Sequence, residues 1–246
     1  MTPTTLIGAT GLVGSHILTT LLALQSISQV NILSRRSPPT THQKLSPFIE
    51  SDSTKWGPHI KSLTPTPEIF FSGLATTRGA VGGFDNQYKI DHDMNLELAK
   101  AAKESGTKVY VLISVAGASS SSPFAYTKMK GELEEHVKEL GFERTVFVRP
   151  GLINGDRQES RPQEAAFQFV ANMMGKVHPF LKESWAQDAD YIAKASVKAG
   201  LLALEGKTPK GSEKVWIVSG SDIIRMGKKE WDDGSAGKQE TGKQEL

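Results

Sequence analysis

Tyr126 and Lys130 stand four residues apart in the run YTKMK. On a helix this spacing brings both side chains to one face, one turn apart. The lysine ammonium group would stabilise the phenolate and lower the tyrosine pKa, so the tyrosine could give a proton to a carbonyl oxygen or take one from an alcohol. We interpret the two residues as a candidate acid–base pair. The alternative is an exposed tyrosine beside a helical lysine, because such a spacing also arises by chance.

Two polar residues upstream fit the same chemistry. Ser114 ends the apolar run KVYVLIS, which is typical of a central parallel strand, so its hydroxyl should lie at the carboxyl edge of a sheet. There it could hydrogen-bond the reacting oxygen and stabilise the charge that develops on it. Asn95 lies inside a predicted helix and could orient a water molecule linked to Lys130. An asparagine that faces solvent or caps a bend is the alternative interpretation of Asn95.

Three glycines, Gly8, Gly11 and Gly14, follow a short apolar run and precede a segment with apolar residues at helical spacing. A strand, a glycine turn and a helix together form the geometry that binds a dinucleotide. Glycine lets the backbone approach the pyrophosphate, and the helix directs its partly positive N-terminus at the phosphates. The residues that we expect to contact a cofactor here are Gly8, Ala9, Thr10, Gly11, Leu12, Val13 and Gly14.

Arg35 and Arg36 follow the second predicted strand, residues 29–34. They lie about 20 residues past the glycines, where an acidic residue holds the ribose 2′-hydroxyl of NAD and an arginine accommodates the 2′-phosphate of NADP. A guanidinium group can pair with that phosphate in bidentate fashion. The pair therefore predicts NADPH as the cofactor. Two solvated arginines at the end of a strand are the alternative.

Strands and helices alternate along most of the chain. This alternation predicts an α/β fold, a Rossmann-like doubly wound parallel sheet with helices on both faces and a small C-terminal extension. The expected strands after the second are residues 68–73, 108–114, 145–149 and 214–219, and the expected later helices are residues 91–105, 125–140, 163–174 and 189–204. The proline-rich segment 37–67 should be a loop-heavy crossover with a short helix at 44–50 and a short strand at 59–63.

Ligands of open parallel sheets bind at the carboxyl ends of the strands. Leu74, Ala75 and Thr76 follow the predicted strand 68–73 and are therefore candidate neighbours of the cofactor. An ordinary glycine-rich loop is the alternative. Residues 1–226 should form a single NAD(P)-binding domain, in which residues 151–213 contribute a substrate-side lobe. The charged residues 227–246 should form a disordered tail.

The composition of the 246 residues excludes several other classes of protein. The net charge of +2 and the lack of a basic block argue against a nucleic-acid partner. The chain has no cysteine, and its six histidines show no metal-ligand spacing, so we expect no metal site. No apolar run approaches the roughly 18 residues of a membrane span, and the first strand leaves no room for a cleaved targeting peptide.

In this order, the glycines, Ser114 and Tyr126-x-x-x-Lys130 resemble the short-chain dehydrogenase/reductases, and G-x-x-G-x-x-G fits their extended and atypical branches. A narrower resemblance extends from the first strand to about Gly227. The chain looks like the fungal "found in mitochondrial proteome" proteins, atypical members related to the animal Tat-interacting-protein oxidoreductases. This resemblance rests on the runs LSRR, TKWG, IFFSGLATTR, YTKMKGELEEHV, VRPGLINGDRQESRP and WAQDADYIAKA.

The resemblance implies a Rossmann fold, NADPH binding and peripheral attachment to the cytosolic face of the mitochondrial outer membrane. It also implies that Ile153 and Arg161 approach the cofactor, and that a homodimer could form through the helices at Asp91 and Tyr126. One departure is Ala75, where related proteins often carry glycine. A methyl group there could hinder the approach of the backbone.

Two functions remain open from the sequence. The first is an NADP-dependent oxidoreductase that transfers hydride to or from a small carbonyl or alcohol substrate, with Tyr126 as general acid or base. The second is an NADPH-sensing regulatory protein at the mitochondrial surface with little turnover. The complete set of Ser114, Tyr126 and Lys130 favours the enzyme, because a protein that only binds needs no tuned phenol.

Overall fold

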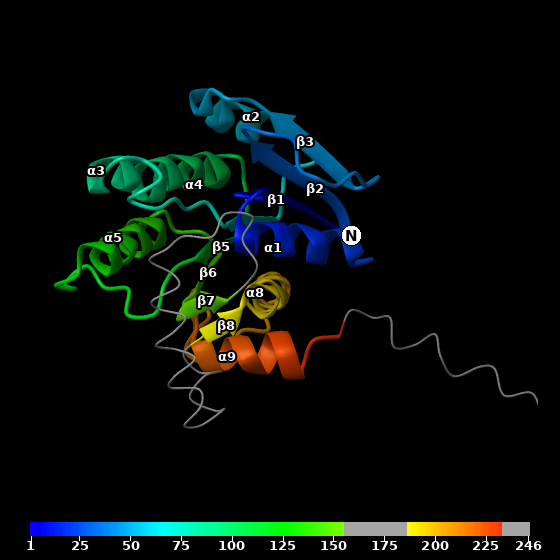
Figure 1. Cartoon of the computed structure of the whole chain (residues 1–246). Coiled ribbons are helices and arrows are strands. Elements are labelled where there is room, and N and C mark those ends of the chain that lie inside the picture. The colour runs from blue at the N-terminus through cyan, green and yellow to red at the C-terminus, as the bar shows by residue number, and fades with distance from the viewer. Residues whose placement is uncertain (155–185, 233–246) are drawn as a thin grey trace, which may run out of the picture.

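Seven parallel strands form the centre of the molecule, in the order β3-β2-β1-β4-β5-β6-β9 (Figure 1). The computed structural model describes residues 1–154 and 186–232. The order runs outward from β1 in both directions, which confirms the predicted doubly wound sheet. The strands are β1 (Thr2–Ile7), β2 (Ile27–Ser34), β3 (Leu45–Ile49), β4 (Ile69–Ser72), β5 (Val109–Ile113), β6 (Arg144–Val148) and β9 (Val215–Val218).

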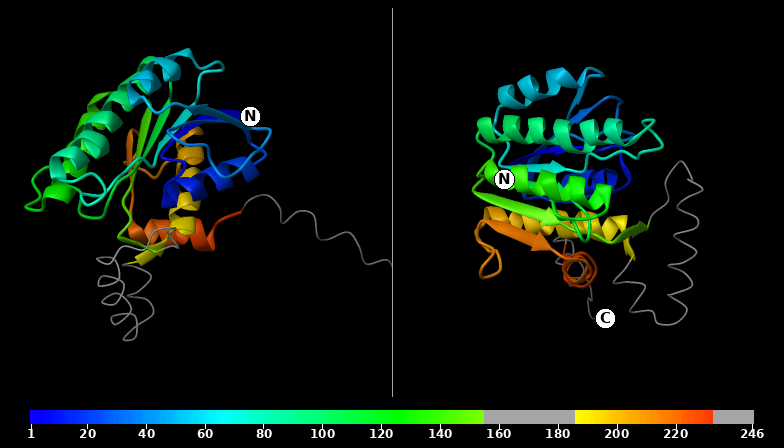
Figure 2. Two further views of the ribbon diagram at one scale, coloured as in Figure 1. Left: turned by 45° about the horizontal axis from the view of Figure 1, so that its top comes forward. Right: turned by 90° about the vertical axis from the view of Figure 1, so that its left-hand side faces the viewer.

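Helices cover both faces of this sheet, as the two views of Figure 2 show. They are α1 (Leu12–Ala23), α2 (Trp56–Ser62), α3 (Phe84–Tyr88), α4 (Asn95–Glu104), α5 (Ala125–Glu139), α8 (Ala189–Leu204) and α9 (Gly220–Ile224). Shorter turns are η1 (Ser53–Lys55) and the π-helical η2 (Lys89–Met94) and η3 (Arg225–Lys229). Within the described residues, no helix is both long and apolar enough to cross a membrane.

The two faces of the sheet are covered by different helices because successive strand residues point in opposite directions. Leu6 packs with α1 and α8, whereas the next residue, Ile7, packs with α2, α4 and α5. In β4, Phe70 and Phe71 divide between the same two clusters. Buried on both sides, the central strands read as continuous apolar runs, which is why the sequence predicts them well.

The segment between β2 and β4 differs from the prediction. Residues 44–50, expected to be helical, contain the edge strand β3, which pairs with β2 alone in the described part of the chain. Leu45 and Phe48 satisfy a helical spacing, but the hydrogen bonds that decide their conformation come from β2, far away in the sequence. Pro47 is tolerated because an edge strand can leave one side without N–H donors.

Residues 59–63, expected to be a strand, lie instead in α2 and at its end. Trp56 and Ile60 are one turn apart and fully buried, and the ring of His59 stacks on Phe48 with 3.7 Å between centroids. The carboxylate of Asp52 accepts a hydrogen bond from the Thr54 amide and caps the preceding turn η1. The segment is therefore a helix that covers β3.

A second, two-stranded parallel sheet lies beside the C-terminal part of the large sheet (Figure 1). It pairs β7 (Leu152–Asn154) with β8 (Ala186–Asp188), so that Ile153 lies opposite Gln187. The predicted helix at 163–174 lies outside the described residues.

The packed part of the chain continues beyond residue 226, where the sequence predicts the tail to begin. Met226 and Gly227 are buried in η3, and a Cβ at Gly227 would lie only 2.1 Å from the carbonyl oxygen of Tyr191. Trp231 still packs against the core. The packed part therefore extends past the predicted boundary, because the residues from 227 onward, which read as charged and glycine-containing, include the apolar anchor Trp231. Residues 233–246 lie outside the described part.

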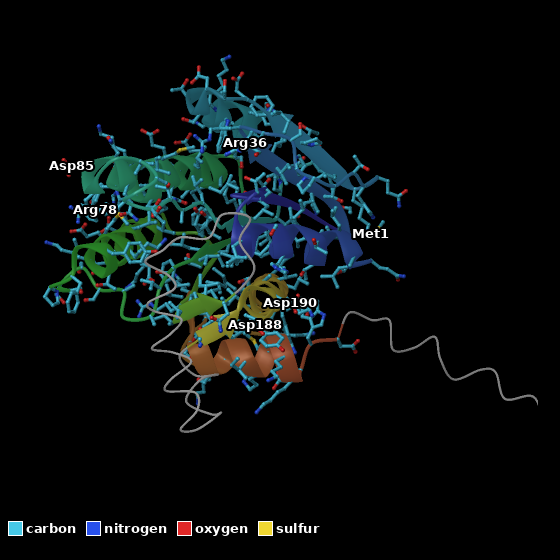
Figure 3. All side chains as sticks on the ribbon, in the orientation of Figure 1. Met1, Arg36, Arg78, Asp85, Asp188 and Asp190 are labelled. Atoms are coloured by element: carbon cyan, nitrogen blue, oxygen red, sulfur yellow. The ribbon has the colours of Figure 1, made fainter. Side chains whose placement is uncertain are left out.

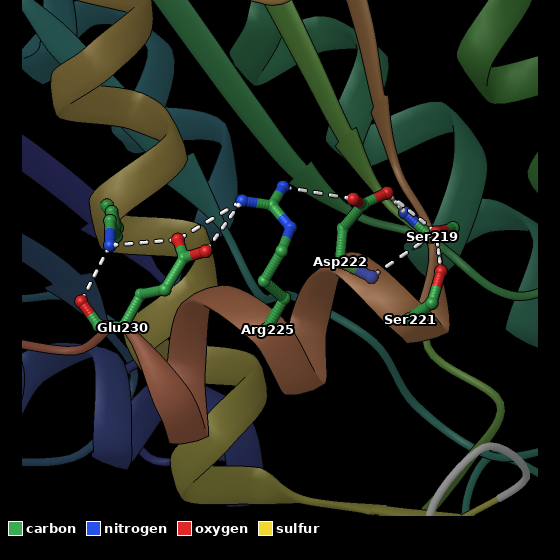
Figure 4. A network of polar contacts seen from close by, with 6 residues as sticks. Ser219, Ser221, Asp222, Arg225 and Glu230 are labelled. Atoms are coloured by element: carbon green, nitrogen blue, oxygen red, sulfur yellow. Dashed lines mark hydrogen bonds and ion pairs between the residues drawn. The ribbon is translucent and has the colours of Figure 1, made fainter.

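Polar contacts tie this C-terminal segment to the body of the molecule (Figure 4). Ser219 and Asp222 form a capping box at the start of α9. Arg225 bonds the carboxylates of Asp222 and Glu230, and Lys198 on α8 bonds the Glu230 carbonyl oxygen at 2.7 Å. Because single exposed ion pairs contribute little, the buried side chains of η3 must supply most of the stabilisation.

Candidate functional site

The glycine loop between β1 and α1 is shaped by direct contact of backbone on backbone. Gly8 has a φ of +80°, and a Cβ there would lie 2.5 Å from the carbonyl carbon of Gly73. A Cβ at Gly14 would lie 2.0 Å from the Gly8 oxygen. Gly11 is exposed at the start of α1, and the described residues provide neither a side-chain cap nor an acidic residue in that first turn. The helix N-terminus is therefore suited to an anion.

The other predicted residues of this loop divide between packing and exposure. Ala9 and Val13 are buried in the core behind α1, whereas Thr10 is exposed and Leu12 is half-buried. A cofactor on this loop would therefore meet mainly backbone amides and the side chains of Thr10 and Leu12. The exposed glycine loop and the N-terminus of α1, which together we call the glycine cradle, fit a pyrophosphate because no described side chain caps that helix end.

The loop after β4 lies against the glycine loop, since a Cβ on Gly8 would also come within 2.6 Å of the Leu74 amide nitrogen. Leu74 is half-buried and Ala75 is exposed. Both therefore lie in the region that the sequence predicts for the cofactor.

Asn95 forms part of the wall behind this loop. Its side-chain nitrogen donates to the carbonyl oxygens of Leu74, Ile90 and Asp91 at 3.1–3.2 Å, and its oxygen accepts from the Ser72 hydroxyl at 2.5 Å. The side chain is fully buried, so the interpretation of a solvent-facing asparagine is wrong. Two of these carbonyl oxygens, those of Ile90 and Asp91, belong to the π-helical turn η2. A role for Asn95 in orienting water on Lys130 stays a prediction.

Ser114 and Lys130 meet at the carboxyl end of β5. The amine of Lys130, a fully buried side chain, donates to the carbonyl oxygen of Ile113 at 3.0 Å. The hydroxyl of the next residue, Ser114, is buried and has no hydrogen-bond partner among the described residues. Tyr126 lies one helical turn before Lys130 and is 39% exposed. A buried hydroxyl without a partner is costly in a folded protein and therefore suggests a missing ligand.

The charge of Lys130 is set by opposing influences. Burial lowers the pKa of its amine, while the carboxylates of Asp91 and Glu134 raise it. Glu134 is in turn paired with Arg149, whose Nε and Nη2 donate to it at 3.0 and 2.5 Å. The ion pair with Arg149 already balances the negative charge of Glu134. Asp91 is therefore the carboxylate with the larger effect on the lysine.

Helix α5 is held in place by contacts that the sequence did not predict. A Cβ at Gly131 would lie 2.2 Å from the carbonyl carbon of Ser119, so the loop before α5 crosses directly over this glycine. The Ser119 amide also bonds the Thr127 carbonyl oxygen at 3.1 Å. A glycine in the middle of an otherwise good helical segment is the only sequence signal of this crossing.

The remaining predicted residues are Arg35, Arg36, Ile153 and Arg161. Arg35 and Arg36 are exposed at the end of β2, and their guanidinium groups have no hydrogen bond or ion pair within residues 1–154 and 186–232 (Arg36 is labelled in Figure 3). Ile153 in β7 is half-buried and packs against the core. Beside it, the Gly151 amide donates to the Gln187 side chain at 2.7 Å. Arg161 lies outside the described residues.

The fold is Rossmann-like, with a seven-stranded parallel sheet flanked by helices. Residues 4–192 match the NAD dependent epimerase/dehydratase family, and the chain belongs to that family. Among its relatives, the "Protein fmp52, mitochondrial" of Aspergillus clavatus is 58% identical over 228 residues, which are 91% of this chain and 97% of that protein. The predicted resemblance to the fungal "found in mitochondrial proteome" proteins is thereby confirmed.

Solved structures confirm the fold. The UDP-Glc/GlcNAc 4-epimerase of Campylobacter jejuni superposes with a TM-score of 0.65 at 14% identity, over 92% of this chain and 82% of that one. The Bordetella bronchiseptica enzyme WbmH in complex with NAD+ gives a TM-score of 0.61 at 18% identity, over 84% and 73% of the two chains. The link to the animal Tat-interacting proteins and the outer-membrane location stay predictions.

Proposed function

We propose that this protein is an NADPH-dependent oxidoreductase that acts on a small carbonyl or alcohol substrate. The observation that carries the proposal is the buried, unpartnered hydroxyl of Ser114 beside the buried Lys130 amine. Packing does not explain either polar group at this position. A substrate oxygen bound at the end of β5 would give the serine a partner and would lie near the residues that can handle its proton.

The residues of the N-terminal half fit a nicotinamide dinucleotide. The glycine cradle and the open N-terminus of α1 would hold the pyrophosphate, and Arg35 and Arg36 would pair with the 2′-phosphate, since no described residue occupies their guanidinium groups. Bound NADPH supplies the hydride. A structural neighbour in complex with NAD+ supports the class of cofactor, and the two arginines support NADPH over NADH.

The remaining chemistry belongs to the side chains. The Ser114 hydroxyl would donate to the substrate oxygen and stabilise the charge that develops there. Tyr126 would supply the proton during reduction and take it back during oxidation. The Lys130 ammonium, fixed on the Ile113 carbonyl oxygen, would stabilise the phenolate and also bond the nicotinamide ribose hydroxyls.

We also propose that the protein resides at mitochondria, attached peripherally to the cytosolic face of the outer membrane. Support comes from relatives that are named mitochondrial proteins, at up to 59% identity. The chemistry of the site does not depend on this location.

Thermal melting with NADPH or NADH tests the cofactor. We expect NADPH to raise the melting temperature more than NADH does, by an amount that corresponds to about 2.7 kcal/mol at a hundredfold excess over its dissociation constant. In an Arg35→Ala/Arg36→Ala variant the preference for NADPH should disappear. No shift with either nucleotide would contradict the proposal.

Carbonyl turnover tests the catalyst. NADPH oxidation is followed over a panel of aldehydes, ketones and quinones, and Tyr126→Phe should lower the rate at least about a hundredfold. Tight NADPH binding with no turnover across the panel would favour the alternative, a regulatory protein that senses NADPH.

A further inference from the structure

Three side chains on one run of helix hold the loop after β4. Gln87 in α3, Asp91 in η2 and Asn95 at the start of α4 follow each other at four-residue intervals. All three are buried. Asn95 bonds the Leu74 carbonyl oxygen, while Gln87 and Asp91 both bond the backbone of Thr76. The loop that borders the glycine cradle is thus fixed from behind.

Asp91 makes the shortest of these contacts to the loop. Its Oδ1 accepts the Thr76 amide at 2.6 Å, and its Oδ2 lies 3.5 Å from the Gln87 side-chain nitrogen, which also donates to the Thr76 carbonyl oxygen at 3.2 Å. The Asp91 side chain is entirely shielded from solvent. A buried carboxylate with only these two donors among the described residues keeps a negative charge that needs a further partner.

That partner comes from α5, which packs against η2. Lys130 is the buried cation of this helix; Glu134, its other buried charged group, is paired with Arg149. On η2 itself, His92 and Asp93 bond each other, and His92 also bonds His136 of α5. Lys130 is therefore the buried cation whose charge acts on the Asp91 carboxylate.

We propose that Asp91 is a positioning residue that joins the two halves of the site: its carboxylate fixes the Thr76 peptide beside the glycine cradle, and its charge keeps the buried Lys130 as an ammonium ion. This inference rests on the proposed function, which gives Lys130 its task. Asp91 needs no contact with substrate or cofactor to act in this way.

The ionisation of the two residues is consistent with this role. Burial raises the pKa of Asp91 to about 6, against the opposing effects of the Thr76 amide, the Lys130 charge and the Gln87 amide. At pH 7 and above the carboxylate is therefore largely ionised. The pKa of Lys130 is lowered by burial and raised first by Asp91, so loss of the carboxylate charge would lower it further.

Two substitutions separate the charge from the hydrogen bond. Asp91→Asn keeps an oxygen for the Thr76 amide but removes the charge, whereas Asp91→Ala removes both. Two probes separate the halves of the site: adenosine 2′,5′-bisphosphate reports the adenosine side alone, and NADPH reports both sides. Binding of each is measured by calorimetry between pH 7 and pH 9.5, with the folded state checked by circular dichroism.

We expect Asp91→Asn to bind the bisphosphate as wild type does. Its NADPH affinity should fall at a lower pH than in wild type, because the lysine loses its proton earlier. Asp91→Ala should weaken bisphosphate binding roughly tenfold at every pH, because the loop has lost its anchor. Gln87→Leu is the matched control, because it removes one hydrogen bond to Thr76 and keeps the Asp91 charge. In this variant the NADPH affinity should fall at the same alkaline pH as in wild type.

Failure of this inference differs from failure of the proposed function. An alkaline fall of NADPH affinity at the same pH in wild type and Asp91→Asn would overturn the role in the charge of Lys130. Unchanged bisphosphate binding by a folded Asp91→Ala protein would overturn the role in the loop. If wild type binds neither probe, the proposed function is wrong, and the inference that rests on it is overturned as well.

Discussion

At the scale of single residues, Ser114 is the side chain whose presence is hardest to explain by packing. Its hydroxyl is buried without a partner in the described part of the chain, although an alanine would fill nearly the same space. A buried hydroxyl without a partner lowers stability, so its presence at the end of a central strand suggests a functional role.

Ser114→Ala should therefore have opposite effects on stability and on activity. We expect the free energy of unfolding to rise by about 1 kcal/mol, because the variant no longer buries an unpaired hydroxyl. Carbonyl reduction should fall about a hundredfold through loss of the hydrogen bond to the substrate oxygen. Urea denaturation and steady-state kinetics measure the two effects. A variant less stable than wild type would indicate that the serine has a structural partner.

Asn95 shows why residue roles are harder to predict than residue positions. Its place near the site follows from helix periodicity. Its bonds, however, run to Ser72 and Leu74 on a neighbouring strand and loop, and no local pattern encodes such contacts. The role of Asp91 is not predictable for a related reason. The sequence predicts a helix that begins at Asp91, whereas the helical run begins at Phe84 and places Asp91 in its interior.

At the scale of elements, the position of α5 depends on its packing against the preceding loop. Gly131 allows Ser119 to pass over the helix, and the Arg149–Glu134 pair attaches the helix to the end of β6. These contacts place Tyr126 and Lys130 relative to Ser114. The geometry of the site is therefore set at points outside the site itself.

Gly131→Ala should destabilise the protein by about 3 kcal/mol, because the new methyl group meets backbone atoms that cannot move away easily. Gly57→Ala in α2 is the matched control: its Cβ would make an ordinary 3.8 Å contact with Ala101, and we expect a gain of about 0.5 kcal/mol. Chemical denaturation of both variants gives the comparison. Equal stabilities would show that the loop adapts to the methyl group.

The elements that the sequence predicts well are those whose own residues decide their conformation. The helix predicted at 189–204 is observed as α8 with the same limits, and the buried strands follow from their apolar runs. The predictions for residues 44–63 were wrong because short segments with mixed patterns take their structure from partners that are distant in the sequence. The spacing of Leu45 and Phe48 fits a helix, but pairing with the edge of β2 makes the segment a strand.

At the scale of the whole molecule, the described part of the chain ends with a segment, α9 and η3, that packs against α8. The turn η3 buries Met226 and brings Trp231 onto the core cluster that α1 and α8 share. The C-terminal segment therefore stabilises the helix layer of α1 and α8, and the glycine loop leads directly into α1.

Shortening the chain tests this contribution. A protein that ends at Ile224 should lose about 3 kcal/mol of stability, or roughly 10 °C in melting temperature, through the lost burial of Met226 and Trp231. A protein that ends at Asp232 keeps every contact that the structure describes and should melt as the full chain does. Calorimetric melting of both proteins decides the point; equal loss in both would place the stabilising contacts beyond Asp232.

The backbone contacts of the glycine loop bear on how this sequence can change over evolutionary time. Gly8 is required by its contact with Gly73, and Gly14 by its contact with Gly8, whether or not a dinucleotide is bound. A lineage that abandoned turnover would still keep both glycines, while Ser114 would be free to drift toward alanine. Among descendants of this fold, a retained serine at the end of β5 is therefore a better marker of surviving catalysis than the glycine motif.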